Sequence, residues 1–212
     1  MFDFTKVQLT VTRRDGTREP FDADRINRSI ERASFGMIDP ISKVTQVATD
    51  THVTLYDGIT EEELDFATIN AAVQNIKEDI DYDKIATRLL LKTVYKNVLG
   101  DYKGEAELKA LHKKHFAEYI KTGVANGILD KRMQENFDLE RLSNALDISR
   151  DELFIYAGLD GLLNRYSIKD KKQKAFETPQ YLFMRVAMGN SYNEKDSTDW
   201  AIKFYEKMSQ HE

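Results

Sequence analysis

The amino-acid sequence predicts a mainly α-helical protein that begins with a β-hairpin. Two patterns indicate this class. Apolar residues alternate with polar ones in an early segment, residues 7–14, and further along the chain they recur at helical spacing behind helix-start signals. No apolar run approaches the roughly 20 residues needed to cross a bilayer. With 212 residues, 41% of them hydrophobic, the chain can form one large domain or two small ones.

The expected hairpin occupies residues 7–21. Val7, Leu9 and Val11 alternate with more polar residues, as in a half-buried strand. Asp15-Gly16 follows and predicts a type I′ turn, because both residues tolerate the positive φ that its two central positions need. The chain would then return as a second strand.

Four helices are expected in the rest of the first hundred residues. Asp22 can cap the first helix, and Asp39-Pro40 marks the start of the second, which would run to about Tyr56. Thr60 to Glu63 forms a capping box for the third, and the fourth spans about Asp83 to Leu99. The second helix is rich in β-branched residues and could instead be a strand, but the spacing of its apolar residues favours a helix.

A polar segment bracketed by glycines, Gly100 to Gly104, indicates a domain boundary, with domains at residues 1–100 and 101–212. A long helix from Glu105 to about Gly123 and several shorter helices are expected after it. Their start signals are a second capping box, a threonine before proline and a serine cap: Ser149-Arg150-Asp151-Glu152, Thr178-Pro179 and Ser197. Residues 166–176 predict a short polar hairpin.

Composition excludes several classes of function. The net charge is −5, and 31 basic residues are interleaved with 36 acidic ones, which argues against nucleic-acid binding. Cysteine is absent, so disulfides, thiolate metal sites and thiyl chemistry are excluded within this chain. The first residues lack a basic stretch leading into an apolar core, so we expect a cytoplasmic protein without membrane contact. The sequence has no phosphate-binding glycine loop and no nucleophile elbow, and we expect no turnover by this chain alone.

Two side-chain clusters have a functional and a simpler interpretation. His112 and His115 could face one metal ion, but no third ligand is evident and a solvated surface is preferred. The lysines of the polar hairpin could contact phosphate or an acidic partner, although a solvated turn is favoured. They are Lys169, Lys171, Lys172 and Lys174.

Three segments of the first half resemble the signature of the ATP-cone family. The matching residues are Val11-Thr12-Arg13-Arg14-Asp15-Gly16-Thr17 with Glu19-Pro20-Phe21-Asp22 and Arg25-Ile26, then Tyr56-Asp57-Gly58-Ile59, then Asp81-Tyr82 with Ala86-Thr87-Arg88-Leu89. The resemblance implies a β-hairpin lid over a four-helix bundle that binds a nucleotide. These are the elements predicted above.

The second half is similar to the helical region that follows the cone in large subunits of class I ribonucleotide reductases. The similar stretches are residues 151–159, 165–168 and 177–184. The resemblance implies the ATP- and dATP-sensing portion of ribonucleoside-diphosphate reductase, which makes deoxyribonucleotides for DNA synthesis, ending before the catalytic barrel. The implied partners are the catalytic remainder of the large subunit, covalent or split, and a radical-generating small subunit, in a homo-oligomeric holoenzyme. No redox cofactor is implied for this chain.

The resemblance also implies the residues of a nucleotide site. They are Val11, Arg13, Arg14, Glu19, Asp22, Arg25, Ile26, Glu61, Leu64, Asp65 and Lys96. Arg13, Arg14 and Lys96 would bind phosphates, because clustered phosphate charge needs several cations. Glu19 and Asp22 would contact the base, Val11 and Ile26 would enclose it, and Arg25 would lie near base or ribose. Solvated charges and ordinary core packing are the simpler alternatives.

Glu61 and Asp65 depart from the family's pattern, which has threonine and histidine at these positions. Carboxylates there would repel an anion unless Mg²⁺ bridges them. The expected effector is therefore ATP or dATP with Mg²⁺. Three arrangements stay open: an unaltered site, a site for two nucleotides, and a degenerate cone that serves as an interaction module for the catalytic remainder or the small subunit.

Overall fold

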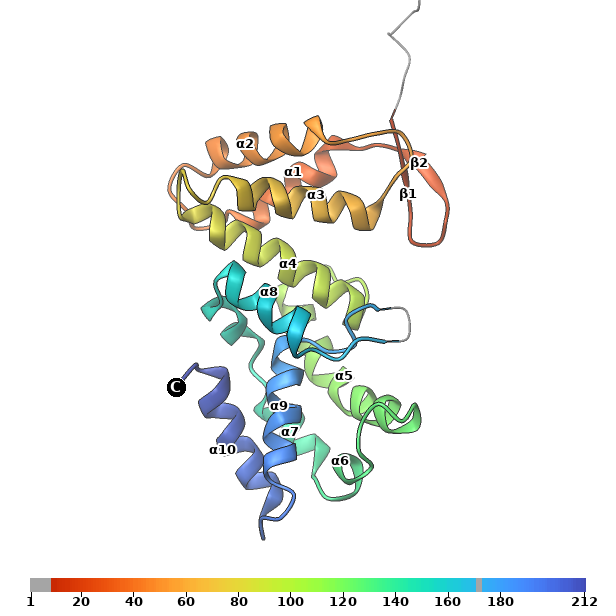
Figure 1. Ribbon diagram of the computed structural model, residues 1–212, viewed down its shortest axis with the longest axis vertical. Helices are drawn as coiled ribbons and strands as arrows, with labels where there is room; N and C mark the ends of the chain where they lie inside the picture. Colours follow the sequence, from red (N-terminus) through yellow and green to blue (C-terminus); the bar gives the residue numbers. More distant parts are fainter. Residues whose placement is uncertain (1–8, 171–172) are drawn as a thin grey trace, which may run out of the picture. The chain divides into compact units, whose positions relative to one another are not determined.

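The computed structural model describes residues 9–170 and 173–212, which form two compact units (Figure 1). The first unit reaches to Leu90 and the second runs from Leu91 to Glu212, so the division lies within a helix, α4 (Asp81–Leu99). The predicted organisation into domains at 1–100 and 101–212 stays a prediction. Val7, Lys171 and Lys172, which the sequence placed in hairpins, lie outside the described residues.

The first unit contains a three-stranded sheet in the order β2-β1-β3. Strands β1 (Thr10–Thr12) and β2 (Arg18–Pro20) form the predicted hairpin, with Val11 opposite Glu19. Strand β3 (Ile59–Thr60) pairs parallel to β1. It was not predicted, because two residues are too few to show an alternating pattern.

The turn of the hairpin differs from the predicted type I′. Gly16 has a φ of 85°, whereas Asp15 is not among the residues with positive φ. The Gly16 N–H donates to the Arg13 carbonyl (2.9 Å), and the Arg13 N–H donates to the Thr17 carbonyl (2.7 Å). The turn is therefore a four-residue turn closed by one left-handed glycine. The Asp15 carboxylate accepts from the backbone N–H and the hydroxyl of Thr17, at 2.9 and 2.6 Å.

Helices α1 (Ala23–Ala33), α2 (Pro40–Val53) and α3 (Glu61–Gln74) pack beside one another in the first unit (Figure 1). The predicted start signals are confirmed. Asp22 accepts from the Asp24 N–H, and Thr60 and Glu63 form a reciprocal capping box. The second segment is a helix despite its β-branched residues, although it ends at Val53 and not near Tyr56.

The second unit is built from helices. They are α5 (Glu105–Ala125), α6 (Arg132–Glu135), α7 (Leu139–Ala145), the 3₁₀ helix η2 (Ile148–Leu153), α8 (Tyr156–Arg165), α9 (Pro179–Asn190) and α10 (Ser197–Ser209). Helices α9 and α10 lie side by side (Figure 1). The largest fully buried side chains of the core are aromatic, namely Tyr119, Tyr181, Tyr205 and Phe116. Among the described residues, no helix has the length and apolar character needed to span a membrane.

Two start signals of the second unit were wrong. Ser149 does not begin a capping box, because Asp147 caps η2 by accepting from the backbone N–H and hydroxyl of Ser149. Ser197 is the first residue of α10 and not its cap, and its hydroxyl donates to the Asn136 carbonyl (2.9 Å). The Thr178 cap is confirmed, since its side chain accepts from the Tyr181 N–H.

The expectation of solvated histidines was also wrong. His112 is 1% exposed, lies with Nε2 2.9 Å from the Thr178 hydroxyl, and stacks on Tyr181. Burial lowers the pKa of His112 to about 3. His115 is half-buried. Among the described residues, no group of three or more His, Cys, Asp or Glu could hold a metal ion.

Candidate functional site

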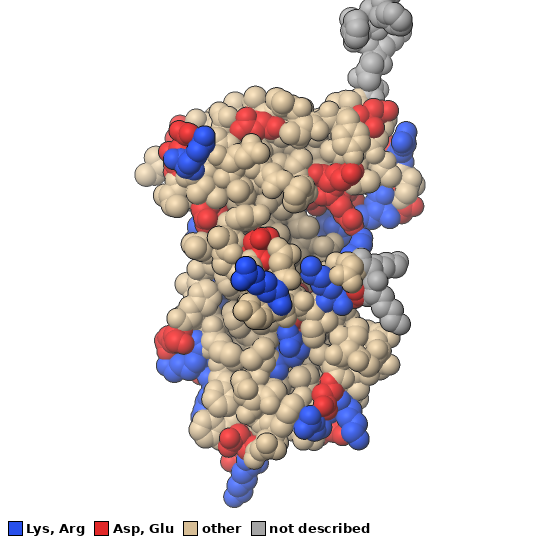
Figure 2. Space-filling view, viewed as in Figure 1, with Lys and Arg blue, Asp and Glu red and all other residues tan. Residues whose placement is uncertain are grey.

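Three arginines and two glutamates meet where the hairpin joins the helices of the first unit. Arg13 follows β1 and Arg14 comes next, Arg25 lies in the first turn of α1, Glu19 is on β2 and Glu61 is the first residue of α3. We call these five residues the arginine–glutamate cluster. Figure 2 shows basic and acidic side chains next to one another at this end of the unit.

Strand register explains why the cluster forms. Thr12 on β1 pairs with Thr60 on the parallel strand β3. The following residues, Arg13 and Glu61, are therefore brought side by side. The antiparallel pairing of Val11 with Glu19 brings the second glutamate beside β1.

Arg13 makes the shortest contacts of the cluster. Its Nη2 lies 2.6 Å from Glu19 Oε1, and its Nη1 lies 2.7 Å from Glu61 Oε1. The hydrogen bond with Glu19, helped by the one with Glu61 and opposed by burial, raises the pKa of Arg13 above its usual value. Arg13 is therefore a fixed cation whose donors point at two carboxylates.

Arg25 and Arg14 complete the cluster around the same carboxylates. Arg25 Nη1 lies 2.9 Å from Glu19 Oε1, and its Nη2 lies 3.6 Å from Glu61 Oε1. Arg14 Nε lies 4.0 Å from Glu61 Oε2. The Glu61 side chain is only 13% exposed, so it is the inner member of the group. Three guanidiniums and two carboxylates give the cluster a formal charge of about +1. This charge is too small to hold an anion strongly unless one carboxylate moves away or is bridged by a cation.

A loop before α3 holds this arrangement in place, which the sequence did not predict. Asp57 accepts from the backbone N–H and hydroxyl of Thr10, at 2.9 and 2.6 Å. Gly58 has a φ of 82°, and its N–H donates to the Thr10 carbonyl. The Thr12 hydroxyl donates to the Gly58 carbonyl (2.9 Å). The segment Tyr56-Asp57-Gly58-Ile59 therefore fastens β3 to β1, and this explains the resemblance there in structural terms.

The apolar residues predicted to enclose a base are part of the core. Val11 and Ile26 are each 5% exposed. Asp22 is exposed, caps α1, and lies 3.5 Å from Arg28 Nη2 through its other oxygen. The structure thus shows the simpler role of each residue, and base contact by any of them stays a prediction.

The remaining predicted residues lie on α3 and α4. Leu64 and Asp65 are half-buried and follow Glu61 by about one helical turn. Lys96 belongs to the second unit, and its ammonium lies 3.7 Å from Asp101 Oδ1. A place for Lys96 in the nucleotide site therefore stays a prediction.

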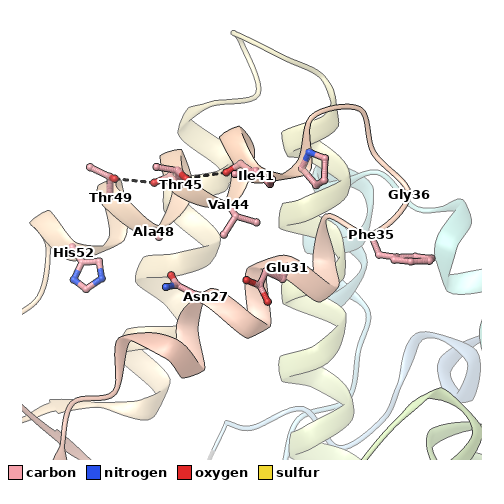
Figure 3. Close-up of a pocket in the computed structure, with 11 residues that line it drawn as sticks. Asn27, Glu31, Phe35, Gly36, Ile41, Val44, Thr45, Ala48, Thr49 and His52 are labelled. Carbon is pink, nitrogen blue, oxygen red and sulfur yellow. Dashed lines mark hydrogen bonds between the residues drawn. The ribbon is translucent and has the colours of Figure 1, made fainter.

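The first unit also contains a groove of about 800 Å³ between α1 and α2 (Figure 3). Asn27 and Glu31 on α1 face Val44, Ala48 and His52 on α2 across it. Among the described residues that line the groove there is no lysine or arginine. The groove therefore lacks the cations that a triphosphate requires, and the arginine–glutamate cluster is the better candidate for an anion.

Two family models match the chain. Residues 9–97 match the model of the family described as "ATP cone domain". Residues 152–212 match that of the family "Ribonucleotide reductase, all-alpha domain". The chain therefore belongs with the amino-terminal part of ribonucleotide reductase alpha subunits, in which a cone is followed by this helical domain.

Curated relatives agree with this assignment. The ribonucleoside-diphosphate reductase subunit alpha of Chlamydia muridarum is 42% identical over 154 residues, which are 73% of this chain and 14% of the relative. That of Helicobacter pylori is 32% identical over 205 residues, 96% of this chain and 25% of the relative. Subunit alpha of reductase 1 from Escherichia coli is 28% identical over 206 residues, 95% of this chain and 26% of the relative. The chain thus spans about a quarter or less of the length of these relatives.

Proposed function

We propose that the first unit binds ATP or dATP and acts as the allosteric sensor of a class I ribonucleoside-diphosphate reductase. One observation carries the proposal: three guanidiniums converge at the hairpin of a domain that matches the ATP cone. One guanidinium group can donate two parallel hydrogen bonds to the oxygens of a phosphate, and a triphosphate needs several such cations.

The cluster also indicates how the site would take up an anion. Arg13 would exchange its hydrogen bond to Glu61 for one to a phosphate oxygen, and Arg25 and Arg14 would add further donors. Glu61 would then lose a charged partner, so Mg²⁺ shared between this carboxylate, Asp65 and the phosphates would fit the donor set. We therefore expect Mg²⁺ to strengthen binding.

A sensor regulates only if the nucleotide distinguishes between two states of the protein. We propose that these are association states of the complete enzyme, which comprises the catalytic remainder of the large subunit and a radical-generating small subunit. ATP and dATP would favour different states, and each state would in turn alter the affinity for nucleotide by the same factor.

Calorimetric titration of the full chain with ATP and with dATP, with and without Mg²⁺, tests the proposal. Saturable binding is expected, tighter with Mg²⁺. A chain that releases no heat and shows no rise in Tm with either nucleotide, with or without Mg²⁺, would overturn the regulatory function.

A second candidate is an interaction module without nucleotide, and one observation favours it: Glu19 and Glu61 already occupy the donors of Arg13. The double variant Arg13→Ala, Arg14→Ala separates the candidates, with Arg28→Ala on the exposed side of α1 as the control. Nucleotide sensing predicts that the pair abolishes binding while the control retains it. Binding that survives in the pair would mean that the phosphate site lies elsewhere.

A further inference from the structure

A buried carboxylate lies at the centre of the second unit's polar contacts. Asp151, on η2, is 1% exposed. The Tyr95 hydroxyl donates to its Oδ2 and the Gln180 amide donates to its Oδ1, each at 2.6 Å. Both oxygens of an otherwise costly buried group are therefore satisfied by side chains from other elements.

The chain of hydrogen bonds continues beyond Gln180. The Tyr205 hydroxyl donates to Gln180 Oε1 (2.6 Å), and the Asp147 backbone N–H donates to the Tyr205 hydroxyl oxygen (2.8 Å). Gln180 and Tyr205 are fully buried. The donor and acceptor roles are fixed from the Asp147 N–H through Tyr205 and Gln180 to Asp151 Oδ1. The network joins α4, η2, α9 and α10, and such satisfied buried networks make a core rigid.

Tyr95 is the member of this network that α4 contributes. The same helix is held by polar contacts to α1 and α2 in the first unit. Arg88 Nη1 donates to the carbonyls of Ala33 and Phe35 at the end of α1, each at 2.9 Å. Lys43 on α2 lies 3.3 Å from Asp81, the first residue of α4. One continuous helix is thus attached to the nucleotide-sensing elements at one end and to the Asp151 network at the other.

We propose that Tyr95 is a positioning residue through which α4 transmits nucleotide binding in the first unit to α9 and α10. The inference rests on the proposed nucleotide function. Helix α1 carries Arg25 of the arginine–glutamate cluster near its start, and Arg88 holds its end. A change in α1 therefore acts on α4.

The Asp151 network then determines what α4 can do. If α4 rotated or slid alone, Tyr95 would leave Asp151 Oδ2, and a buried carboxylate would lose one of its two side-chain donors. We expect η2 and α9 to move with α4 instead, because this keeps the hydrogen bond between Tyr95 and Asp151. Helix α10 would move with them through Tyr205. In this proposal, the continuity of α4 and the Asp151 network carry the effect of nucleotide binding.

Hydrogen–deuterium exchange of the full chain, with and without saturating Mg-dATP, tests this coupling. In the wild-type chain, dATP should slow exchange in the hairpin and α1, and also in α9 and α10 by about fivefold or more, the lower end of usual coupling factors. Tyr95→Phe should retain the protection of the hairpin and α1 but lose that of α9 and α10. Tyr166→Phe, which removes a hydroxyl from an exposed tyrosine of the same unit, should behave as wild type.

The outcomes separate this inference from the function on which it rests. Protection of the hairpin and α1 without protection of α9 and α10 in the wild type would overturn the coupling alone, as would full protection of α9 and α10 in Tyr95→Phe. No protection anywhere would overturn the nucleotide function itself. Asp151→Asn is the second variant should Tyr95→Phe fail to fold. Asparagine offers one acceptor oxygen for two donors, so the same loss of protection in α9 and α10 is expected.

Discussion

Replacing Glu61 by glutamine should increase the affinity of the chain for nucleotide in the absence of Mg²⁺. Glu61 accepts a 2.7 Å hydrogen bond from Arg13, and their side chains are 13% and 30% exposed. Glutamine keeps a hydrogen bond to the charged guanidinium but removes the attraction between the two charges, which contributes about 1 kcal/mol for a partly exposed pair. Binding a phosphate on Arg13 should therefore cost about 1 kcal/mol less in the variant, an increase in affinity of about fivefold.

The assay is calorimetric titration with dATP in the presence of a chelator, repeated with Mg²⁺. Asp24→Asn is the matched control, because it removes one exposed negative charge from the same unit. The advantage of Glu61→Gln should shrink or reverse with Mg²⁺, since the lost carboxylate could no longer bridge the metal. The variant should also be about 1 kcal/mol less stable without nucleotide, because the guanidiniums lose a charged partner.

An affinity of Glu61→Gln equal to or below that of Asp24→Asn without Mg²⁺ would refute this reasoning. It would mean that Glu61 does not compete with phosphate for Arg13. The glutamates would then serve only to join the hairpin to α3.

Two further predictions concern pH and the hairpin. Burial lowers the pKa of His112 from 6.5 to about 3, so the stability that neutral His112 contributes is lost as pH falls below about 6.5. Burial raises the pKa of Asp151 from 3.8 to about 7, so the stability that protonated Asp151 contributes is lost as pH rises from about 3.8 towards 7. Each slope is about 1.4 kcal/mol per pH unit, and the two oppose each other. The stability of Asp151→Asn, measured by urea unfolding between pH 4 and 6, should therefore rise with pH more steeply than that of the wild type, by about this amount. Equal slopes in the two proteins would contradict the assignment. Gly58→Ala should destabilise the first unit by about 1–2 kcal/mol, measured as a fall in Tm, because φ is 82° and a Cβ would lie 2.8 Å from Arg18 Nη2. Gly104→Ala is the control and should change Tm little, because a Cβ there meets nothing within 4 Å. Equal falls in Tm would refute backbone strain at Gly58.

Features set by neighbouring residues could be predicted from the sequence. The Asp22 cap and the Thr60–Glu63 capping box were found because each satisfies amides within about one turn of the helix start. The same local rule failed at Ser149, where Asp147, two residues earlier, accepts from the amide and hydroxyl that the rule had assigned. A match to a capping pattern does not show which of two nearby acceptors is used.

Features set by pairing across the chain could not be predicted. The contact between Arg13 and Glu61 depends on the register of β3, and a two-residue strand has no periodicity to reveal it. The sequence therefore predicted both residues as members of a site, but it treated Glu61 as a source of repulsion or a carboxylate for Mg²⁺ and not as a partner of Arg13. The burial of His112 did leave a signal, since it lies four residues from both Leu108 and Phe116 on the apolar side of α5.

The most direct test is to locate bound nucleotide on the full chain by backbone amide NMR during titration with Mg-dATP. Binding at the arginine–glutamate cluster predicts that the largest shift changes fall on residues 13–19, the first turn of α1 and the first turn of α3. Shift changes confined to the groove between α1 and α2, or none at saturating nucleotide, would contradict the proposed site.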